Sequence, residues 1–316
     1  MQTQLKTTEV SNGNYLPVNS GWSIWWKMLR PHTLTASFVP VTIGSALSLP
    51  YAHFRIDLFF AMLLACMLIQ AATNIFNEYY DYSRGLDQAH SVGIGGTIVR
   101  DGIAPNLVLR LAQITLAVAF IIGLYIANAT SWWLLVCGLV SATIGYLYSG
   151  GPYPISATPF GEIVSGFCMG VVIILISFFI QTQTILLETI FVSIPTALLI
   201  GAILMSNNLR DLENDKPYRK TLAIMLGRTV ATKTLILMFI LAYLGIILLV
   251  SFGIVGPWSL LAFCSLPKAV QAAKGFRKNT ASPMVLMPAM VATAKTNTIF
   301  GLAFAVGLFI QYLSSQ

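Results

Sequence analysis

Two stretches of the sequence place asparagine and aspartate directly after long apolar runs. The first is NEYYDYSRGLD at 77–87, and the second is NNLRDLEND at 207–215. In each, an asparagine is followed four residues later by an aspartate and then by a further aspartate. The leading asparagines are 130 residues apart. This indicates a weak internal duplication, a pattern common in membrane folds.

Helical spacing places the polar residues of each stretch on one face of a helix end. The two sets are Asn74, Asn77 and Asp81, at i, i+3 and i+7, and Asn207, Asp211 and Asp215, at i, i+4 and i+8. Gly85 is expected to break the first helix, which would let Asp87 fold back towards the same face.

The residue types in these stretches suit the binding of a phosphorylated lipid. Asp and Asn oxygens are ligands for Mg²⁺, which usually bridges one or two carboxylates to substrate phosphates. Five cations beside them could bind further phosphate oxygens: Arg84, Arg210, Lys216, Arg219 and Lys220. The combination indicates a diphosphate ester with an apolar tail in the membrane. The alternative is a pair of solvated helix ends with ordinary surface acids.

Ionising such an ester requires neutralised charge on the leaving diphosphate and a dry cavity for the allylic cation. Aromatic faces stabilise cations, and five tyrosines are available for this: Tyr79, Tyr80, Tyr146, Tyr148 and Tyr153. Taken one at a time, each is better explained as a packing or interface residue.

The composition places these stretches in a membrane protein. Of the 316 residues, 56% are hydrophobic and only 9% are charged, with a mean hydropathy of +0.77, whereas soluble domains carry about 25% charged residues. All four cysteines lie in apolar runs, and nothing suggests disulfides or a zinc site. The net charge of +7 is better explained by membrane topology than by nucleic acid, which is not an expected partner.

Nine runs are long and apolar enough to span a bilayer. They cover 33–50, 57–76, 106–127, 131–149, 161–181, 186–206, 232–252, 257–273 and 296–313. Pro267 and Lys268 interrupt the eighth run. The connections at 77–105, 207–231 and 274–295 are long and polar. The fold class is therefore an all-α membrane bundle, with a polar tail at 1–21 and a single transmembrane domain at 22–316.

The basic residues predict which side the polar connections face. With the N-terminus in the cytoplasm, seventeen of the eighteen Lys and Arg residues lie at cytoplasmic connections or near cytoplasmic helix ends, and only Arg55 lies outside. This asymmetry places both acidic stretches in the cytoplasm. Trp22, Trp25 and Trp26 precede the first span at helical spacing, which predicts a short helix at the membrane interface or packed against the bundle. Arg30 ends that helix, as a phosphate or headgroup contact or as a topological anchor.

The sequence resembles the UbiA superfamily of intramembrane aromatic prenyltransferases over nearly the whole chain after residue 22. The similarity runs through LRPHTLTASFVPVTIGSAL (29–47), NIFNEYYDYSRGLD, GGTIVRDGIAP (95–105), YLYSGGPYPISATPFGEI (146–163) and NNLRDLENDKPYRKTLAIMLGR (207–228). Within the superfamily, the last two stretches and the G-x-D ending of the first acidic motif favour the branch that prenylates 1,4-dihydroxy-2-naphthoate over the ubiquinone and haem O branches. Glu78 departs from the pattern, because the family usually has Asp there.

The resemblance implies a nine-helix bundle with a central cavity under a cytoplasmic cap, in the cell membrane. It implies that polyprenyl diphosphate binds through Mg²⁺ at the two Asp-rich motifs, with Asp81, Asp87, Asp211 and Asp215 as catalytic metal ligands. It also implies diphosphate contacts and an aromatic or prenyl cavity. The diphosphate contacts expected are Asn77, Asn207, Arg210, Lys216, Arg219, Lys220 and Arg30, and the cavity residues are Tyr148, Tyr153 and Glu162.

Two alternatives to this function stay open at the level of the sequence. A cation-coupled transporter would also use paired acids, although such sites lie near the bilayer midplane on broken helices. Another superfamily member would prenylate 4-hydroxybenzoate, homogentisate or a porphyrin. The length of the prenyl chain depends on the depth of the cavity, which the sequence does not give.

Overall fold

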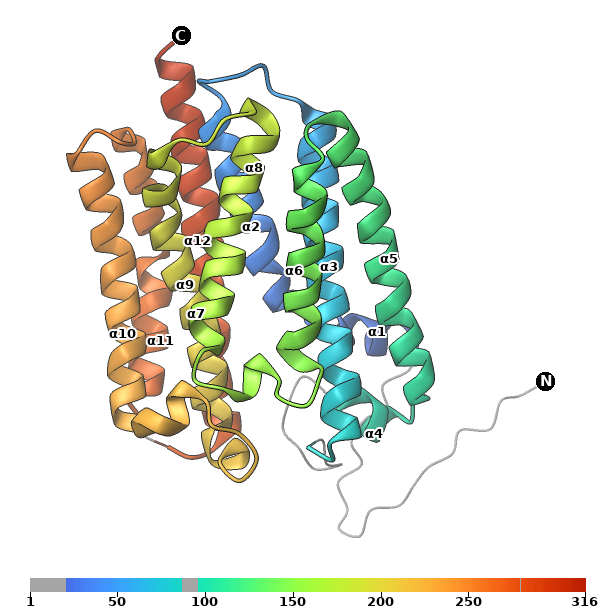
Figure 1. Cartoon of the computed structure of the whole chain (residues 1–316). Coiled ribbons are helices and arrows are strands. Elements are labelled where there is room, and N and C mark those ends of the chain that lie inside the picture. Colours follow the sequence, from blue (N-terminus) through green and yellow to red (C-terminus); the bar gives the residue numbers. More distant parts are fainter. Residues whose placement is uncertain (1–20, 87–95, 279) are drawn as a thin grey trace.

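The computed structural model describes residues 21–86, 96–278 and 280–316, and within these ranges it is helical without strands (Figure 1). The long elements are α2 (Pro31–Ser48), α3 (Ile56–Ser83), α5 (Pro105–Ala129), α6 (Trp133–Ser149), α9 (Leu187–Asp215), α10 (Leu222–Ser251) and α12 (Pro283–Ser314). A further continuous helix comprises α7 (Gly161–Ser165), the π-helical segment η2 (Gly166–Val172) and α8 (Ile173–Thr182). The shorter elements are α1 (Trp22–Met28), α4 (Thr97–Asp101), η1 (Ile155–Ala157), η3 (Pro257–Ser265) and α11 (Leu266–Phe276).

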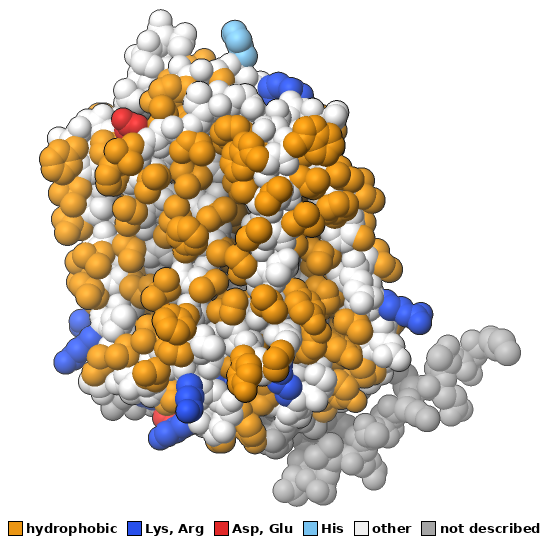
Figure 2. Space-filling view, in the orientation of Figure 1, with side chains coloured by type: hydrophobic (Ala, Val, Ile, Leu, Met, Phe, Trp, Pro, Cys, Tyr) orange, Lys and Arg blue, Asp and Glu red, His pale blue; other side chains and the backbone are white. Residues whose placement is uncertain are grey.

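The helices are those of a membrane protein. In the part of the chain that the structure describes, six are long and apolar enough to cross a bilayer, namely α3, α5, Gly161–Thr182, α9, α10 and α12, and the apolar α2 and α6 are shorter. In Figure 2, hydrophobic side chains cover most of the face, and most of the Lys and Arg visible on it lie towards its lower end. The all-α class is confirmed, and each predicted span lies on helical structure, but the count of nine spans is not confirmed.

Two predicted boundaries are wrong because helices continue into regions interpreted as loops. The helix α12 begins at Pro283 rather than at 296, so Lys295 lies within it and not near a helix end. Pro283 occupies the first turn, where it costs no hydrogen bond, and Leu286 and Met290 are buried in the core. Similarly, α10 begins at Leu222 rather than at 232, with a kink at Gly227.

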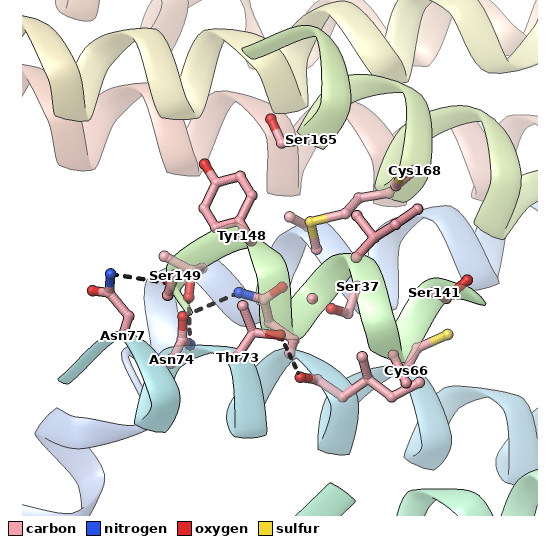
Figure 3. Close-up of a pocket in the computed structure, with 18 of the residues that line it drawn as sticks. Ser37, Cys66, Thr73, Asn74, Asn77, Ser141, Tyr148, Ser149, Ser165 and Cys168 are labelled. Atoms are coloured by element: carbon pink, nitrogen blue, oxygen red, sulfur yellow. Dashed lines mark hydrogen bonds between the residues drawn. The ribbon is translucent and has the colours of Figure 1, made fainter. Parts of the chain in front are cut away.

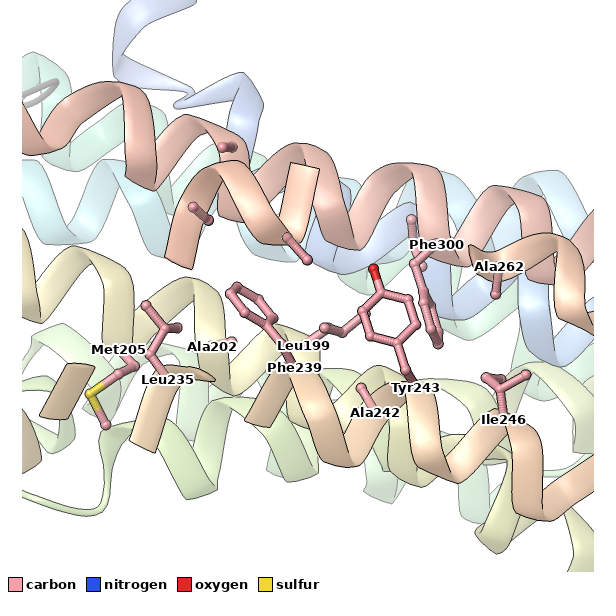
Figure 4. Packing of buried hydrophobic residues seen from close by; sticks show 14 of the residues in the cluster. Leu199, Ala202, Met205, Leu235, Phe239, Ala242, Tyr243, Ile246, Ala262 and Phe300 are labelled. Atoms are coloured by element: carbon pink, nitrogen blue, oxygen red, sulfur yellow. The ribbon is translucent and has the colours of Figure 1, made fainter. Parts of the chain in front are cut away.

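The main core lies between α9, α10, α12 and η3 (Figure 4). Leu199 of α9 and Phe300 of α12 are fully buried, together with Ile246 of α10. The segment η2 packs so tightly on α9 that a Cβ at Gly170 would lie 2.3 Å from the Cα of Ala197. Small residues permit such close approach of membrane helices.

Both acidic helix ends lie at the same end of the bundle (Figure 1). The helix α3 ends at Ser83, and Gly85 follows with a left-handed φ of 69°, which confirms the predicted break. The helix α9 continues to Asp215, two residues before Pro217. The short N-terminal helix is also confirmed, as α1. Residues 1–20 of the predicted tail and Asp87 lie outside the described residues.

Candidate active site

A cavity of about 780 Å³ lies between α3, α5, α6, η2 and α9, and its two ends differ in character. One end is lined by the polar side chains Asn77, Asp81, Asn207, Asp211, Asn214, Asp215, Tyr218 and Arg219. The rest is largely apolar, with Leu116, Phe120, Leu134, Ile176 and Ile180 among its walls. Figure 3 shows Asn74 and Asn77 of α3 close to Tyr148 and Ser149 of α6 in this cavity.

The cavity is as long as a bilayer is thick. The residues of α3 that line it run from Met62 to Asp81. At 1.5 Å per residue this span corresponds to about 28 Å, close to the hydrocarbon thickness of about 30 Å. The cavity can therefore hold an anionic group at its polar end and a long apolar chain along its length.

Arg219 connects the two acidic helix ends across the mouth of the cavity. Its Nη2 lies 3.0 Å from Oδ1 of Asp81 on α3, and its Nη1 lies 3.5 Å from Oδ2 of Asp215 on α9. Burial lowers the pKa of the Arg219 guanidinium, but the carboxylates of Asp81 and Asp215 outweigh that effect and raise the pKa. Arg219 is thus a fixed positive charge between the two motifs.

Arg210 is held against Asp211 and the core. It is only 8% exposed, its Nε donates to Oδ1 of Asp211 at 2.8 Å, and its Nη2 donates to Oδ2 of the same carboxylate. Its other nitrogen, Nη1, lies 2.7 Å from the sulfur of Met290 on α12. This arrangement fixes the orientation of Asp211, although Arg210 also contributes to the cavity wall.

The asparagines of the two motifs have different surroundings. Asn77 donates from Nδ2 to the hydroxyl of Ser149 at 3.2 Å, and its Oδ1 takes no part in that hydrogen bond. The Oδ1 of Asn207 is buried, lines the cavity region and has no hydrogen-bond partner among the described residues. Asn208, which also lines the cavity, donates to Oε1 of Glu162 at 2.8 Å.

The oxygen donors at the mouth have the chemistry of an Mg²⁺ site. Among the described residues, no three His, Cys, Asp or Glu side chains lie close enough to hold a metal by themselves. Mg²⁺ is commonly held by one or two carboxylates together with substrate phosphates. Asp81, Asp211 and Asp215, with the unpartnered oxygen of Asn207, fit that incomplete set.

Several residues predicted for the site lie away from the cavity wall. Tyr153 is 89% exposed, and Lys216 and Lys220 are also exposed. None of these three lines the cavity. Glu162 is buried behind the wall, with its Oε2 unpartnered. Arg30 and Tyr148, in contrast, do line the cavity.

Glu78 faces a different structure from its neighbours in the first motif. It is fully buried and does not line the cavity. Its carboxylate accepts hydrogen bonds from the backbone N–H groups of Gly96, Thr97 and Ile98 and from the hydroxyl of Thr97 at 2.7 Å. Glu78 thus caps the start of α4. The resemblance does not predict this role for the longer side chain, because the family usually has Asp at this position.

Ser149, Asn214 and Tyr218 are polar residues of the cavity lining that the sequence did not point to. Asn214 lies three residues after Asp211 and could have been found by extending the helical spacing. Tyr218 follows the end of α9, where periodicity no longer applies.

A helical bundle in the membrane, with a tunnel of bilayer length and an acidic, arginine-bridged mouth, defines a class of proteins that handle amphiphilic anions within the bilayer. The model of the UbiA prenyltransferase family matches residues 37–299. The chain therefore belongs to the UbiA prenyltransferase family, which confirms the resemblance inferred from the sequence.

Particular relatives can be compared with the chain. It is 53% identical to 1,4-dihydroxy-2-naphthoate octaprenyltransferase of Bacillus subtilis, over 92% of this chain and 93% of that protein. It is 31% identical to the UbiA prenyltransferase domain-containing protein 1 homolog of Drosophila melanogaster, over 88% of this chain and 77% of that protein.

Among solved structures, a UbiA homolog from Archaeoglobus fulgidus bound to GPP and Mg²⁺ shares the fold. It aligns with a TM-score of 0.62 at 17% identity, over 89% of this chain and 99% of that chain.

Proposed function

We propose that this chain transfers a polyprenyl group from polyprenyl diphosphate to 1,4-dihydroxy-2-naphthoate, with loss of CO₂ and diphosphate. The product would be demethylmenaquinol, a precursor of menaquinone. The observation that carries the proposal is the joining of a polar, acidic mouth to an apolar tunnel of about 28 Å in one cavity. The similarity to the Bacillus subtilis enzyme supports the choice of the naphthoate acceptor.

Mg²⁺ is the metal that the mouth residues would hold, through Asp81, Asp211 and Asp215 with the oxygen of Asn207. Asp87, outside the described residues, is proposed as a further ligand. When bound, the metal would neutralise negative charge on the departing diphosphate.

The residues of the chain bind and orient the diphosphate ester. Arg219 and Arg30 present guanidinium groups at the polar end, where charge-assisted hydrogen bonds to phosphate oxygens are strong. Lys216 and Lys220, exposed beside the mouth, would attract the diphosphate group at the membrane surface through longer-range charge. The apolar walls hold the tail and exclude water from the allylic cation.

The acceptor would lie on the side of Tyr148. The ring of Tyr148 lines the cavity, and Asn208 and Glu162 form a hydrogen-bonded pair next to the motif of α9. The ring carbon of the naphthoate that bears the carboxylate attacks the allylic carbon. A C–C bond forms between these two carbons, the C–O bond to diphosphate breaks, and the carboxylate leaves as CO₂.

The same proposal includes location and orientation. Both acidic helix ends would face the cytoplasm, with the protein in the cell membrane and its N-terminus inside, as the basic residues indicate. In a variant without Cys66, Cys137, Cys168 and Cys264, Lys216→Cys should react with an impermeant thiol reagent only from the cytoplasmic side, and Thr184→Cys only from outside. The opposite pattern would reverse the orientation.

The test of the function is an incubation of purified protein with Mg²⁺, a prenyl diphosphate and separate aromatic acceptors. We expect a prenylated, decarboxylated product from 1,4-dihydroxy-2-naphthoate, identified by its mass. A product from 4-hydroxybenzoate that keeps its carboxylate, with none from the naphthoate, would assign the chain to another branch of the family.

A further inference from the structure

Arg30 occupies a strained position at the edge of the cavity. It joins α1 to α2 with a left-handed backbone, φ 50° and ψ 66°, which costs free energy for a residue with a side chain and persists only where the surroundings hold it. Its side chain lines the cavity, and its Nε is buried without a hydrogen-bond partner.

Asn74 holds the chain on both sides of Arg30. Its Nδ2 donates to the carbonyl oxygen of Leu29 at 2.8 Å and to the hydroxyl of Thr33 at 2.9 Å. The hydroxyl of Thr33 in turn donates to the carbonyl oxygen of Arg30 at 2.9 Å. Gln70 donates to Oδ1 of Asn74 at 3.1 Å and so fixes the amide.

These bonds occupy both hydrogens of the Asn74 amide. Asn74 is 5% exposed, and with both donors committed to the corner between α1 and α2 it has none to offer to an anion. Although Asn74 lies on the same helical face as Asn77 and Asp81, it is therefore not a further donor to an anion bound at that face.

We propose that Asn74 is a positioning residue that holds the left-handed corner at Arg30 and thereby aims the Arg30 guanidinium at the anionic group of the substrate. This inference rests on the proposed function, because it takes the anion to be a diphosphate. A purely structural role for Asn74 would stabilise the packing of α1 on α3 without affecting anion affinity through Arg30.

A double-mutant cycle with inorganic pyrophosphate and Mg²⁺ separates these roles, because it measures binding without prenyl transfer. Arg30→Gln should raise the Kd for pyrophosphate between about ten- and hundredfold, the range for losing a charge-assisted hydrogen bond. Asn74→Leu, similar in shape, should raise it at least about fivefold. In the Arg30→Gln background, Asn74→Leu should have no further effect.

Thr33→Val gives a second route to the same corner if Asn74→Leu does not fold. It removes the bonds to Asn74 and Arg30 and should also weaken pyrophosphate binding in a manner dependent on Arg30. The matched control is Thr115→Val on α5, whose hydroxyl bonds only to Leu111 of its own helix and which does not line the cavity. It should leave the Kd unchanged.

Two outcomes count against the inference in different ways. The positioning role would be overturned if Asn74→Leu left the Kd for pyrophosphate unchanged, or if it raised the Kd equally in the unmodified and Arg30→Gln backgrounds. Either result would leave the proposed function intact. Absence of pyrophosphate binding by the unmodified protein would overturn the proposed function, and the anion-directed role of Arg30 with it.

Discussion

The carboxylates of Asp81 and Asp211 lie on different helices, 130 residues apart in the chain, yet both line the polar end of one cavity. Asp81→Asn or Asp211→Asn removes one negative charge without changing the shape of the side chain. Under the proposed function, each should lower the rate of prenyl transfer by at least about hundredfold, comparable to losing one key electrostatic group in an active site. Initial rates at saturating Mg²⁺ would measure this.

Glu213→Gln is the matched control for these two substitutions. Glu213 is on the same turn of α9 as Asp211, but its carboxylate pairs with Arg228 at 3.4 Å and does not line the cavity. Its neutralisation should change the rate less than about twofold, as for most surface ion pairs. A similar loss in all three variants would indicate a general effect of negative charge rather than a metal site.

Arg219 and Lys220 are adjacent in sequence and differ in position. Arg219 lies between the two motifs on the cavity wall, whereas Lys220 is exposed beside it. Arg219→Gln should raise the KM for prenyl diphosphate about ten- to hundredfold, from the loss of a charge-assisted contact of about 1.5–3 kcal/mol, and should change the KM for the acceptor much less.

Lys220→Gln should change the KM for prenyl diphosphate less than about threefold at physiological salt, where exposed charges are screened. Kinetics with each substrate varied separately would measure both variants. Equal effects of Arg219→Gln and Lys220→Gln would contradict the assignment of Arg219 as the contact at the cavity wall.

At the scale of elements, Glu78 of α3 accepts the hydrogen bonds that hold the start of α4, and Ile98 of α4 packs in the same apolar cluster as Ile75 and Phe76 of α3. Glu78→Gln places an amide against donors that need an acceptor. We expect it to lower the free energy of unfolding by about 1.5–3 kcal/mol, the value of hydrogen bonds to a charged group. Thermal unfolding in detergent would measure this, and faster amide exchange at Gly96 and Thr97 would locate it.

The exposed Glu188 on α9 is the control for Glu78, since Glu188→Gln should lower the free energy of unfolding by less than about 1 kcal/mol, the value of an acid in the first turn of a helix. If Glu78→Gln instead preserved stability and raised the Mg²⁺ concentration needed for half-maximal rate, Glu78 would be a metal-site residue and its cap on α4 incidental.

Sequence periodicity was enough to predict most helices and the shared face of each motif, because apolar runs and i, i+4 spacing are local properties. It failed at the start of α12, which begins at Pro283 rather than at 296, because buried Leu286 and Met290 stabilise the additional turns through tertiary packing. It could not show that Glu78 leaves its motif to cap α4, or that Arg219 bridges Asp81 and Asp215. Those contacts depend on tertiary structure.

At the scale of the whole molecule, the length of the tunnel sets which prenyl chains fit. Gly138 of α6 lines the cavity, and apart from its chain neighbours and the nearby backbone of α6 no atom lies within 4 Å of a Cβ built there. Gly138→Phe would therefore fill part of the apolar tunnel. We expect a shift of kcat/KM towards shorter prenyl diphosphates, measured as competition between a short and a long donor.

The neighbouring Val136→Phe is the control for added bulk, because Val136 is 61% exposed and does not line the cavity. It should leave the preference for donor length unchanged. An unaltered preference in Gly138→Phe as well would show that the prenyl tail follows another path.

The most direct measurement of the central proposal follows the carboxyl carbon of the acceptor. Purified protein is incubated with Mg²⁺, a polyprenyl diphosphate and 1,4-dihydroxy-2-naphthoate labelled in its carboxyl group, and released CO₂ and diphosphate are both counted. The proposal predicts one labelled CO₂ for each diphosphate, and that neither is released in EDTA. Diphosphate release with the label kept in a prenylated product, or undiminished turnover in EDTA, would contradict it.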